Sequence, residues 1–253
     1  YALKNLLKNN KMLYPALYFK TSFPKSRPFL DPKIKQIYDS QYLENREGKS
    51  PMSNIAQKLE SWMHMQTSKA IVSQSRLLEI GAGTLNHLDY QQNYALYDVV
   101  EPYKRLIESS GKKEMINKIY EDIFEVTNEY DCIFSIATLE HLTDLPRVVS
   151  KAATLLSKDG TFLAAIPSEG GFLWGTSWRV STGVEFYIKH RLNYGNLMRY
   201  EHLNNYSEIE SFLRLIFKKV DKKYLGIGGH LSLYQFFECS QPKLNECKNF
   251  LVS

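Results

Sequence analysis

The sequence predicts an α/β fold in which a doubly wound, mostly parallel sheet is covered by helices on both faces, an α-β-α sandwich. Short apolar runs alternate with stretches of helical periodicity over residues 75–167, the order expected of strand–helix–strand units. The run Asp131–Ile136 is nearly continuous in apolar residues, as in a strand buried on both faces. A chain of 253 residues has room for one such domain with added segments.

The first expected element is a helix over Ser53–Ile71, which places Ile55, Leu59, Trp62 and Met63 on one face. A helix with apolar positions between Leu145 and Leu156 ends at the turn Lys158-Asp159-Gly160. A later helix is expected to start at Ser207, because Ser207 and Glu210 match a capping box. Strands are expected at Arg76–Ile80, Leu96–Val100, Lys118–Tyr120, Asp131–Ile136, Thr161–Ile166, Lys218–Leu225 and Leu231–Cys239.

The chain divides into three parts. Residues 1–50 are expected to form a basic, partly helical N-terminal extension, and residues 241–253 a C-terminal tail. Between them, residues 51–240 form the α/β domain. Its regular pattern is interrupted over residues 167–205, a segment with two glycines in a row, two tryptophans and three tyrosines. We expect this insertion to cover the site and to select the substrate.

Composition limits the function classes. No apolar run approaches the length of a membrane span. The three cysteines are odd in number and lack metal-like spacing, which is typical of a reducing compartment and predicts a cytoplasmic protein with no disulfide framework. No Asp/His cluster with ligand spacing is visible, so no metal is expected. Neither a basic domain-wide surface nor an Arg-rich cluster is present, so nucleic acid is not an expected partner.

The net charge of +5 is concentrated at the N-terminus, where residues 1–40 hold eight Lys and Arg against two Asp. Two interpretations stay open. The leader packs on the domain as a partly helical extension, or it makes peripheral contact with an anionic membrane surface. The residues that define this leader are Lys4, Lys8, Lys11, Tyr14, Tyr18, Phe19 and Lys20.

The segment Leu78–Thr84 is the clearest functional motif. A strand that ends in Gly81-Ala82-Gly83 lets the backbone approach a nucleotide-like ligand closely. Glu79 supplies a carboxylate suited to a cationic amino group, and Glu101 stands where an acidic residue accepts ribose hydroxyls in open α/β sites. A NAD site would need glycine at position 86, where Asn86 stands. The pattern favours S-adenosylmethionine (SAM) over NAD.

Five segments in this order resemble the motifs of class I SAM-dependent methyltransferases. They are Leu78–Thr84, Val99–Glu101, Glu121–Ile123, the pair Tyr130–Ser135 and Leu139–Leu142, and Lys158–Phe162. The resemblance covers residues 75–167 and departs at Leu85, where many relatives have another glycine. It implies a Rossmann-like, seven-stranded sheet with an antiparallel last strand, SAM as cofactor and S-adenosylhomocysteine (SAH) as product. The segments Ile166–Gly171 and Arg199–Asn204 are similar to bacterial methyltransferases found among surface-polysaccharide genes.

The resemblance and the strand-end positions give the expected SAM site. Asp122 is expected to bind the adenine amino group, with the plain helix N-cap as its alternative. The small Ala137 after the fourth strand would let the chain pass close to adenosine. The full set of expected cofactor contacts is Glu79, Gly81, Ala82, Gly83, Glu101, Pro102, Asp122, Ile123 and Ala137.

Two histidines are candidates for a catalytic base, because an imidazole takes a proton near neutrality. His141 lies just beyond the fourth strand, and its alternative role is to orient the following loop. His202 lies at the end of the insertion, and its alternative is a structural polar contact. Glu140 beside His141 is expected to anchor the loop, with a base or a metal ligand as alternatives. The expected substrate contacts are Trp178, Arg179, His190, Tyr194 and Tyr200.

These residues predict O-methylation of a small or glycan-linked acceptor, for example a nucleotide sugar or a lipid-linked saccharide, by a monomer or homodimer. Two alternatives remain. One is a non-catalytic SAM- or SAH-binding regulatory module, and the other a methyltransferase that acts on a protein or RNA. The segment Ser135–Thr138 lacks the Asn-Pro-Pro-Tyr-like pattern of amide and exocyclic-amine methylation, which disfavours nucleic-acid targets.

Overall fold

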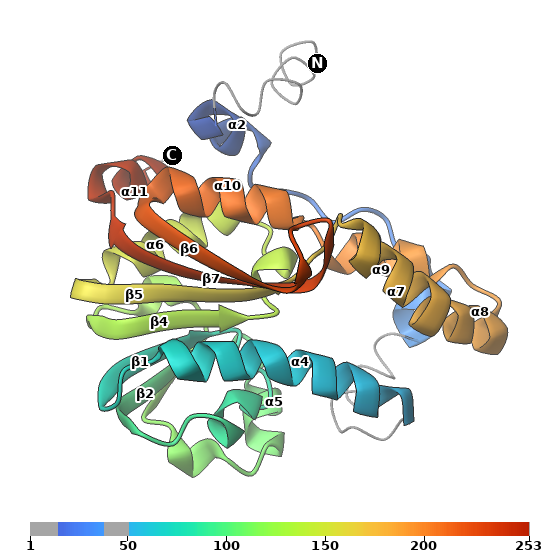
Figure 1. Ribbon diagram of the computed structural model, residues 1–253, viewed down its shortest axis with the longest axis horizontal. Helices are drawn as coiled ribbons and strands as arrows, with labels where there is room; N and C mark the ends of the chain where they lie inside the picture. Colours follow the sequence, from blue (N-terminus) through green and yellow to red (C-terminus); the bar gives the residue numbers. More distant parts are fainter. Residues whose placement is uncertain (1–14, 38–50, 253) are drawn as a thin grey trace.

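A seven-stranded sheet forms the centre of the protein. The computed structural model describes residues 15–37 and 51–252, with side chains of helix α4 described from residue 59. The strands lie in the order β3-β2-β1-β4-β5-β7-β6 (Figure 1). β1 to β5 run parallel, and β7 is antiparallel to both of its neighbours, β5 and β6. The predicted mostly parallel sheet with an antiparallel last strand is confirmed. The strand bounds are β1 Ser75–Ile80, β2 Tyr94–Val100, β3 Lys118–Tyr120, β4 Tyr130–Ile136, β5 Leu156–Pro167, β6 Phe217–Ile227 and β7 Leu231–Pro242.

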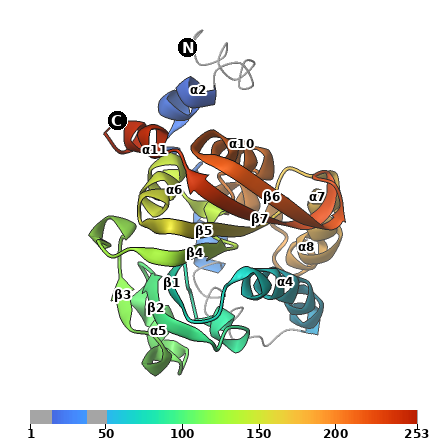
Figure 2. The ribbon, with the colours of Figure 1, turned by 60° about the vertical axis from the view of Figure 1, so that its left-hand side comes forward.

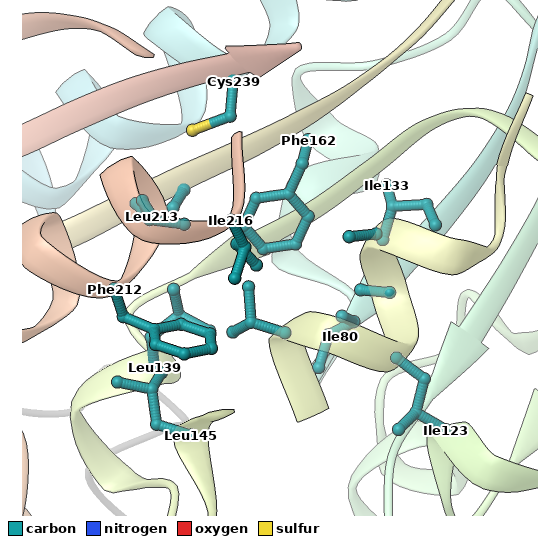
Figure 3. Close-up of a cluster of buried hydrophobic side chains, with 14 of the residues drawn as sticks. Ile80, Ile123, Ile133, Leu139, Leu145, Phe162, Phe212, Leu213, Ile216 and Cys239 are labelled. Atoms are coloured by element: carbon teal, nitrogen blue, oxygen red, sulfur yellow. The ribbon is translucent and has the colours of Figure 1, made fainter. Parts of the chain in front are cut away.

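Helices cover both faces of the sheet (Figure 2). Neighbouring strand residues point to opposite faces, so Leu78 joins one core cluster and Leu77 the other. The helices α6 (Leu145–Thr154), α10 (Tyr206–Ile216) and α11 (Leu244–Leu251) contribute to the first cluster, drawn in Figure 3. The second is covered by α4 (Pro51–Ala70) and α5 (Lys104–Ser109). Each face therefore has its own buried core.

The N-terminal segment packs on the domain in its described part. Helix α2 (Pro15–Ser22) buries Tyr18 and Phe19 in the first core cluster, where the Phe19 ring meets Phe212 edge-on at 4.9 Å. Further along, Leu30 and Ile34 are buried against the helices of the insertion. These contacts support the packed interpretation for residues 15–37. Lys4, Lys8, Lys11 and Tyr14 lie outside the described residues.

The insertion over residues 167–205 is helical. It consists of α7 (Phe172–Trp178), a π-helical turn η5 (Arg179–Gly183), α8 (Val184–His190) and α9 (Tyr194–Glu201). Figure 1 shows these helices beyond one end of the sheet, next to the carboxyl ends of β4 and β5. The remaining short elements are the 3₁₀ turns η1 Asn86–Asp89, η2 Lys113–Met115, η3 Ile123–Glu125 and η4 Leu139–His141.

The start of α10 differs from the prediction. The N-cap is Asn205 and not Ser207: its side chain accepts from the Glu208 N–H, and the Glu208 side chain reaches back to the Asn205 N–H. Two overlapping boxes compete in this sequence. Tertiary contacts select the earlier one, because the buried Glu208 also accepts from Tyr18 and Lys25.

The C-terminal segment expected as a tail contains helix α11. Its Cys247 and Phe250 are buried in the first core cluster, so residues 244–251 belong to the packed domain. Cys132, Cys239 and Cys247 are all free and buried. None of the described helices combines the length and apolar character needed to cross a bilayer.

Candidate functional site

The carboxyl edge of the sheet collects the residues that the sequence singled out. Gly81 follows β1, Glu101 follows β2 and Ala137 follows β4. Backbone hydrogen bonds continue the strand pairing to this edge, from the Gly81 N–H to the Val100 carbonyl at 2.8 Å and from the Ala137 N–H to the Ala165 carbonyl at 2.8 Å. Ligands of open α/β sheets bind at this edge.

The glycine turn requires glycine at its first position. Gly81 has φ +75°, and a Cβ there would lie 2.3 Å from the Thr138 hydroxyl oxygen. The close approach therefore joins the β1 turn to the loop after β4. Leu85, the departure from the family pattern, also has a left-handed backbone with φ 60°, while its side chain is completely buried. Leucine thus keeps the conformation that glycine favours and adds core packing.

Glu101 is a buried carboxylate fixed by two backbone donors. Its Oε2 accepts from the Gly83 N–H at 2.7 Å and its Oε1 from the Tyr103 N–H at 3.0 Å. Each carboxylate oxygen has a second lone pair, so both can accept further hydrogen bonds. Glu101 is therefore held at the strand end in an orientation suited to a pair of hydroxyl donors.

Glu79 lies in β1 with only 3% of its surface exposed. Burial raises the pKa of its carboxyl to about 8, although the hydroxyl of Tyr97, which donates to Oε2 at 2.6 Å, works in the opposite direction. A buried carboxylate without a cation is costly. A positively charged amino group beside Glu79 would stabilise its ionised form.

The other expected cofactor residues differ in what they offer. Asp122 caps η3, since its Oδ1 accepts from the Phe124 N–H at 3.0 Å. The side chains of Ile123 and Ala82 are buried in the first and the second core cluster, so only their backbone groups could contact a cofactor. Pro102 is exposed, and Ala137 is exposed with a left-handed φ of 49°.

His202 is held by an acidic partner. Its Nδ1 lies 2.7 Å from the Glu169 Oε2, which also accepts from the Trp174 indole N–H at 2.7 Å. Burial alone would lower the pKa of His202, but the hydrogen bond to Glu169 and the nearby Glu140 outweigh it and raise the pKa. The same hydrogen bond lowers the pKa of Glu169 despite its burial. The pair forms an oriented imidazole–carboxylate unit.

His141 lies beside His202, with a ring-centroid separation of 4.9 Å. Its Nδ1 is 3.0 Å from the Glu201 carbonyl oxygen. Glu140, just before it, is 1% exposed, and burial raises the pKa of this carboxyl to about 7. The Glu140 carbonyl accepts from the Leu203 and Asn204 N–H groups at 2.8 and 3.0 Å. The loop after β4 and the end of the insertion are thereby joined, so the loop-anchor expectation for Glu140 holds for its backbone.

A cavity of about 440 Å³ lies within the insertion. Its lining includes three of the expected substrate contacts, Trp178, Arg179 and Tyr194, and one candidate base, His202. His190 and Tyr200 do not line it. His190 contacts the Phe186 ring, and Tyr200 lies in the small cluster with Leu30 under a cation–π contact from Arg27. The cavity lining also includes Glu169, Tyr187, Leu192, Asn193, Met198 and Arg199.

Glu169 is a candidate site residue that the sequence analysis did not select. It follows β5 by two positions, the same strand-end placement that identified Glu101. That rule, applied to the fifth strand as well, would have found it. Its pairing with His202, 33 residues away, comes only from the fold of the insertion.

A family model described as a methyltransferase domain matches residues 46–220, more than half of the chain. The chain belongs to this methyltransferase family. Structures of several SAM-dependent methyltransferases share its fold. A SAM-dependent methyltransferase from Thermotoga maritima is 15% identical with a TM-score of 0.53, over 82% of this chain and 96% of that one. A search of curated proteins finds no match.

Two further similar structures contain SAH. The magnesium protoporphyrin IX methyltransferase of Synechocystis is 13% identical with a TM-score of 0.53, over 83% of this methyltransferase and 100% of that chain. The plantazolicin methyltransferase BpumL is 15% identical with a TM-score of 0.54, over 83% and 91% of the two chains. Both proteins share the fold of this methyltransferase, and the chemistry of its own strand-end residues fits SAM. Glu79 suits a cation, and Glu101 has acceptor capacity for two hydroxyls.

Proposed function

We propose that this methyltransferase transfers the methyl group of SAM to a hydroxyl of a small or glycan-linked acceptor. SAM supplies an activated methyl group on a sulfonium with a good leaving group. The residues of this chain align the acceptor, exclude water and remove the hydroxyl proton. In this proposal Glu79 binds the amino group, Glu101 the ribose hydroxyls and Asp122 the adenine.

The observation that carries the O-methylation proposal is the unit of His202 and Glu169 on the cavity wall. The hydrogen bond at Nδ1 fixes the ring, so the opposite nitrogen, Nε2, is the one that can act on an acceptor. An amine acceptor would need no such oriented imidazole. His141, beside His202, is the second candidate base.

The chemistry of the cavity supports an acceptor with sugar-like and anionic parts. Trp178 and Tyr194 give aromatic faces, with ring centroids 5.9 Å apart. Arg179 and Arg199 both line the cavity, and guanidinium groups bind phosphate or carboxylate. A nucleotide sugar or a phosphate-linked saccharide combines these features.

The test is SAH release from a panel of nucleotide sugars, together with calorimetry of SAH binding. Wild type is expected to bind SAH and to turn over a phosphate-bearing saccharide. His202→Ala should keep SAH binding and lose at least about tenfold in turnover, the low end for a lost general base. Glu101→Ala should lose SAH binding. SAH binding with no turnover of any acceptor would favour the non-catalytic binding module instead.

A lipid-linked acceptor would give the basic leader a role at a membrane surface. Because Tyr18 and Phe19 are buried in the domain, the right comparison removes residues 1–14 only, which include Lys4, Lys8 and Lys11. The full chain is expected to co-sediment with anionic vesicles more strongly than the truncated form. Equal sedimentation of the two forms would contradict membrane contact.

A further inference from the structure

Glu140, His141 and His202 form a compact cluster of metal-ligating side chains. One ligand-type atom from each of the three residues lies within 4.8 Å of the other two. The His141 Nε2 is 3.8 Å from the Glu140 Oε1. Two of the residues lie in the turn after β4 and the third follows α9, so the fold alone brings this set together.

Both histidine rings are oriented through their Nδ1 atoms. His202 uses Nδ1 toward the Glu169 carboxylate at 2.7 Å, and His141 uses Nδ1 toward the Glu201 carbonyl at 3.0 Å. A carboxylate or a backbone carbonyl on one ring nitrogen is the arrangement that supports metal-ligating histidines, because it fixes the tautomer and directs the other nitrogen. Here the other nitrogen is Nε2 in both rings.

Glu140 provides an independent indication of a cation. Glu140 is 1% exposed, and its Oε2 has no hydrogen-bond partner among the described residues. A buried carboxylate oxygen without a donor is unfavourable. The Glu140 backbone cannot turn away, because its carbonyl is held by the N–H groups of Leu203 and Asn204. A positive ion between this carboxylate and the two imidazoles would satisfy the oxygen.

We propose that Glu140, His141 and His202 bind a divalent transition-metal ion through the carboxylate and the two Nε2 atoms. Two imidazoles and one carboxylate suit ions such as Mn²⁺, Fe²⁺, Co²⁺ or Zn²⁺ and leave open coordination positions. Mg²⁺ is a poorer match, because it prefers oxygen ligands. Since His202 also lines the cavity, the ion would lie beside the space proposed for the acceptor.

The role of the ion rests on the proposed O-methylation, whereas its binding does not. An acceptor hydroxyl coordinated by the ion has a lowered pKa and releases its proton to water. Its oxygen then bonds to the methyl carbon as the bond from that carbon to sulfur breaks, and the electron pair of that bond stays on sulfur. With the ion bound, the Nε2 of His202 is a ligand, so the ion and not His202 activates the hydroxyl; the role of His202 as base applies to the metal-free protein.

The test titrates Co²⁺ into the full chain after treatment with a chelator and follows the visible absorption of the ligated ion. Wild type is expected to bind one equivalent. Glu140→Gln and His202→Ala should each bind at least about tenfold more weakly. Glu169→Gln, which changes the support of His202 and the acceptor of the Trp174 indole N–H, should weaken binding about 10- to 100-fold. His230→Ala removes an exposed histidine outside the cluster and should bind as wild type does.

SAH calorimetry on the same samples separates the two proposals. A variant that binds SAH as wild type does is folded, so its loss of Co²⁺ binding is assigned to the site. SAH binding with no Co²⁺ absorption in wild type, or equal Co²⁺ binding in wild type, Glu140→Gln and His202→Ala, would overturn the metal site and leave the methyltransferase proposal intact. Co²⁺ binding without SAH binding would overturn only the proposed SAM contacts.

Discussion

Glu79 should make the ligand-free protein less stable as the pH rises. Its carboxyl has an ordinary pKa of 4.5 in the unfolded chain and, through burial, a pKa of about 8 in the folded one. Between these values the folded state binds more protons than the unfolded state, so stability falls with increasing pH. The contribution is complete below pH 4.5 and is lost as the pH rises through about 8.

The size of the effect follows from the two pKa values. Linkage gives a loss on the order of 3 kcal/mol between low pH and pH 7. For a domain of this size that corresponds to about 6–12 °C in melting temperature. The groups that face Glu79 are Tyr97, which donates a hydrogen bond, and Glu101, whose negative charge raises the pKa of Glu79 further.

Replacement of Glu79 by glutamine removes the titration. Thermal melts from pH 5 to pH 9 should show a flatter pH dependence for Glu79→Gln than for wild type. The slope of melting temperature against pH is compared, and not the melting temperature itself, because burying the glutamine amide has its own cost in stability. Glu108→Gln, at an exposed position of α5, should keep the wild-type slope. Identical slopes for Glu79→Gln and wild type would refute the buried, proton-binding carboxyl.

Three further changes test two packed positions and one exposed ion pair. Gly81→Ala should destabilise the protein by about 1–3 kcal/mol in urea, because the new Cβ meets Thr138 and the backbone is left-handed; an unchanged midpoint would contradict the close approach. Phe250→Ala should cost about 3–5 kcal/mol in the same assay, whereas a detached C-terminal tail would give no change. Arg76→Ala should cost less than about 1 kcal/mol at pH 7, because the pair with Asp131 is exposed. The side-chain hydrogen bond from Arg76 lowers the pKa of Asp131 to about 2. The difference in stability between Arg76→Ala and wild type should therefore disappear as the pH falls from about 4 to 2.

The sheet could be predicted because strands buried on both faces need continuous apolar runs, and Tyr130–Ile136 and Thr161–Ile166 have them. The start of β5 was predicted only in part. The strand begins at Leu156, which pairs with Tyr130, whereas the expected start was Thr161. The register shifts after that first pair and continuous pairing with β4 starts at Thr161, so the turn-forming sequence Lys158-Asp159-Gly160 coincides with an irregularity in the strand.

The candidate site divides in the same way. The positions of Glu79, Gly81 and Glu101 at the carboxyl edge could be predicted, because the sheet alone fixes them. The bond between Glu169 and His202 could not, since that contact depends on how the insertion folds back. The helices of the insertion also lack a clear apolar period, because their residues face a cavity and each other as well as the core.

Arg27 links the N-terminal segment to both α9 and the loop after β4. Its guanidinium donates to the carbonyls of Tyr200 and Glu201 at the end of α9 and to that of His141 beyond β4. One side chain from the N-terminal segment thus ties three pieces of chain together. Separation of α9 from the loop after β4 would therefore break either the bonds from Arg27 to Tyr200 and Glu201 or its bond to His141.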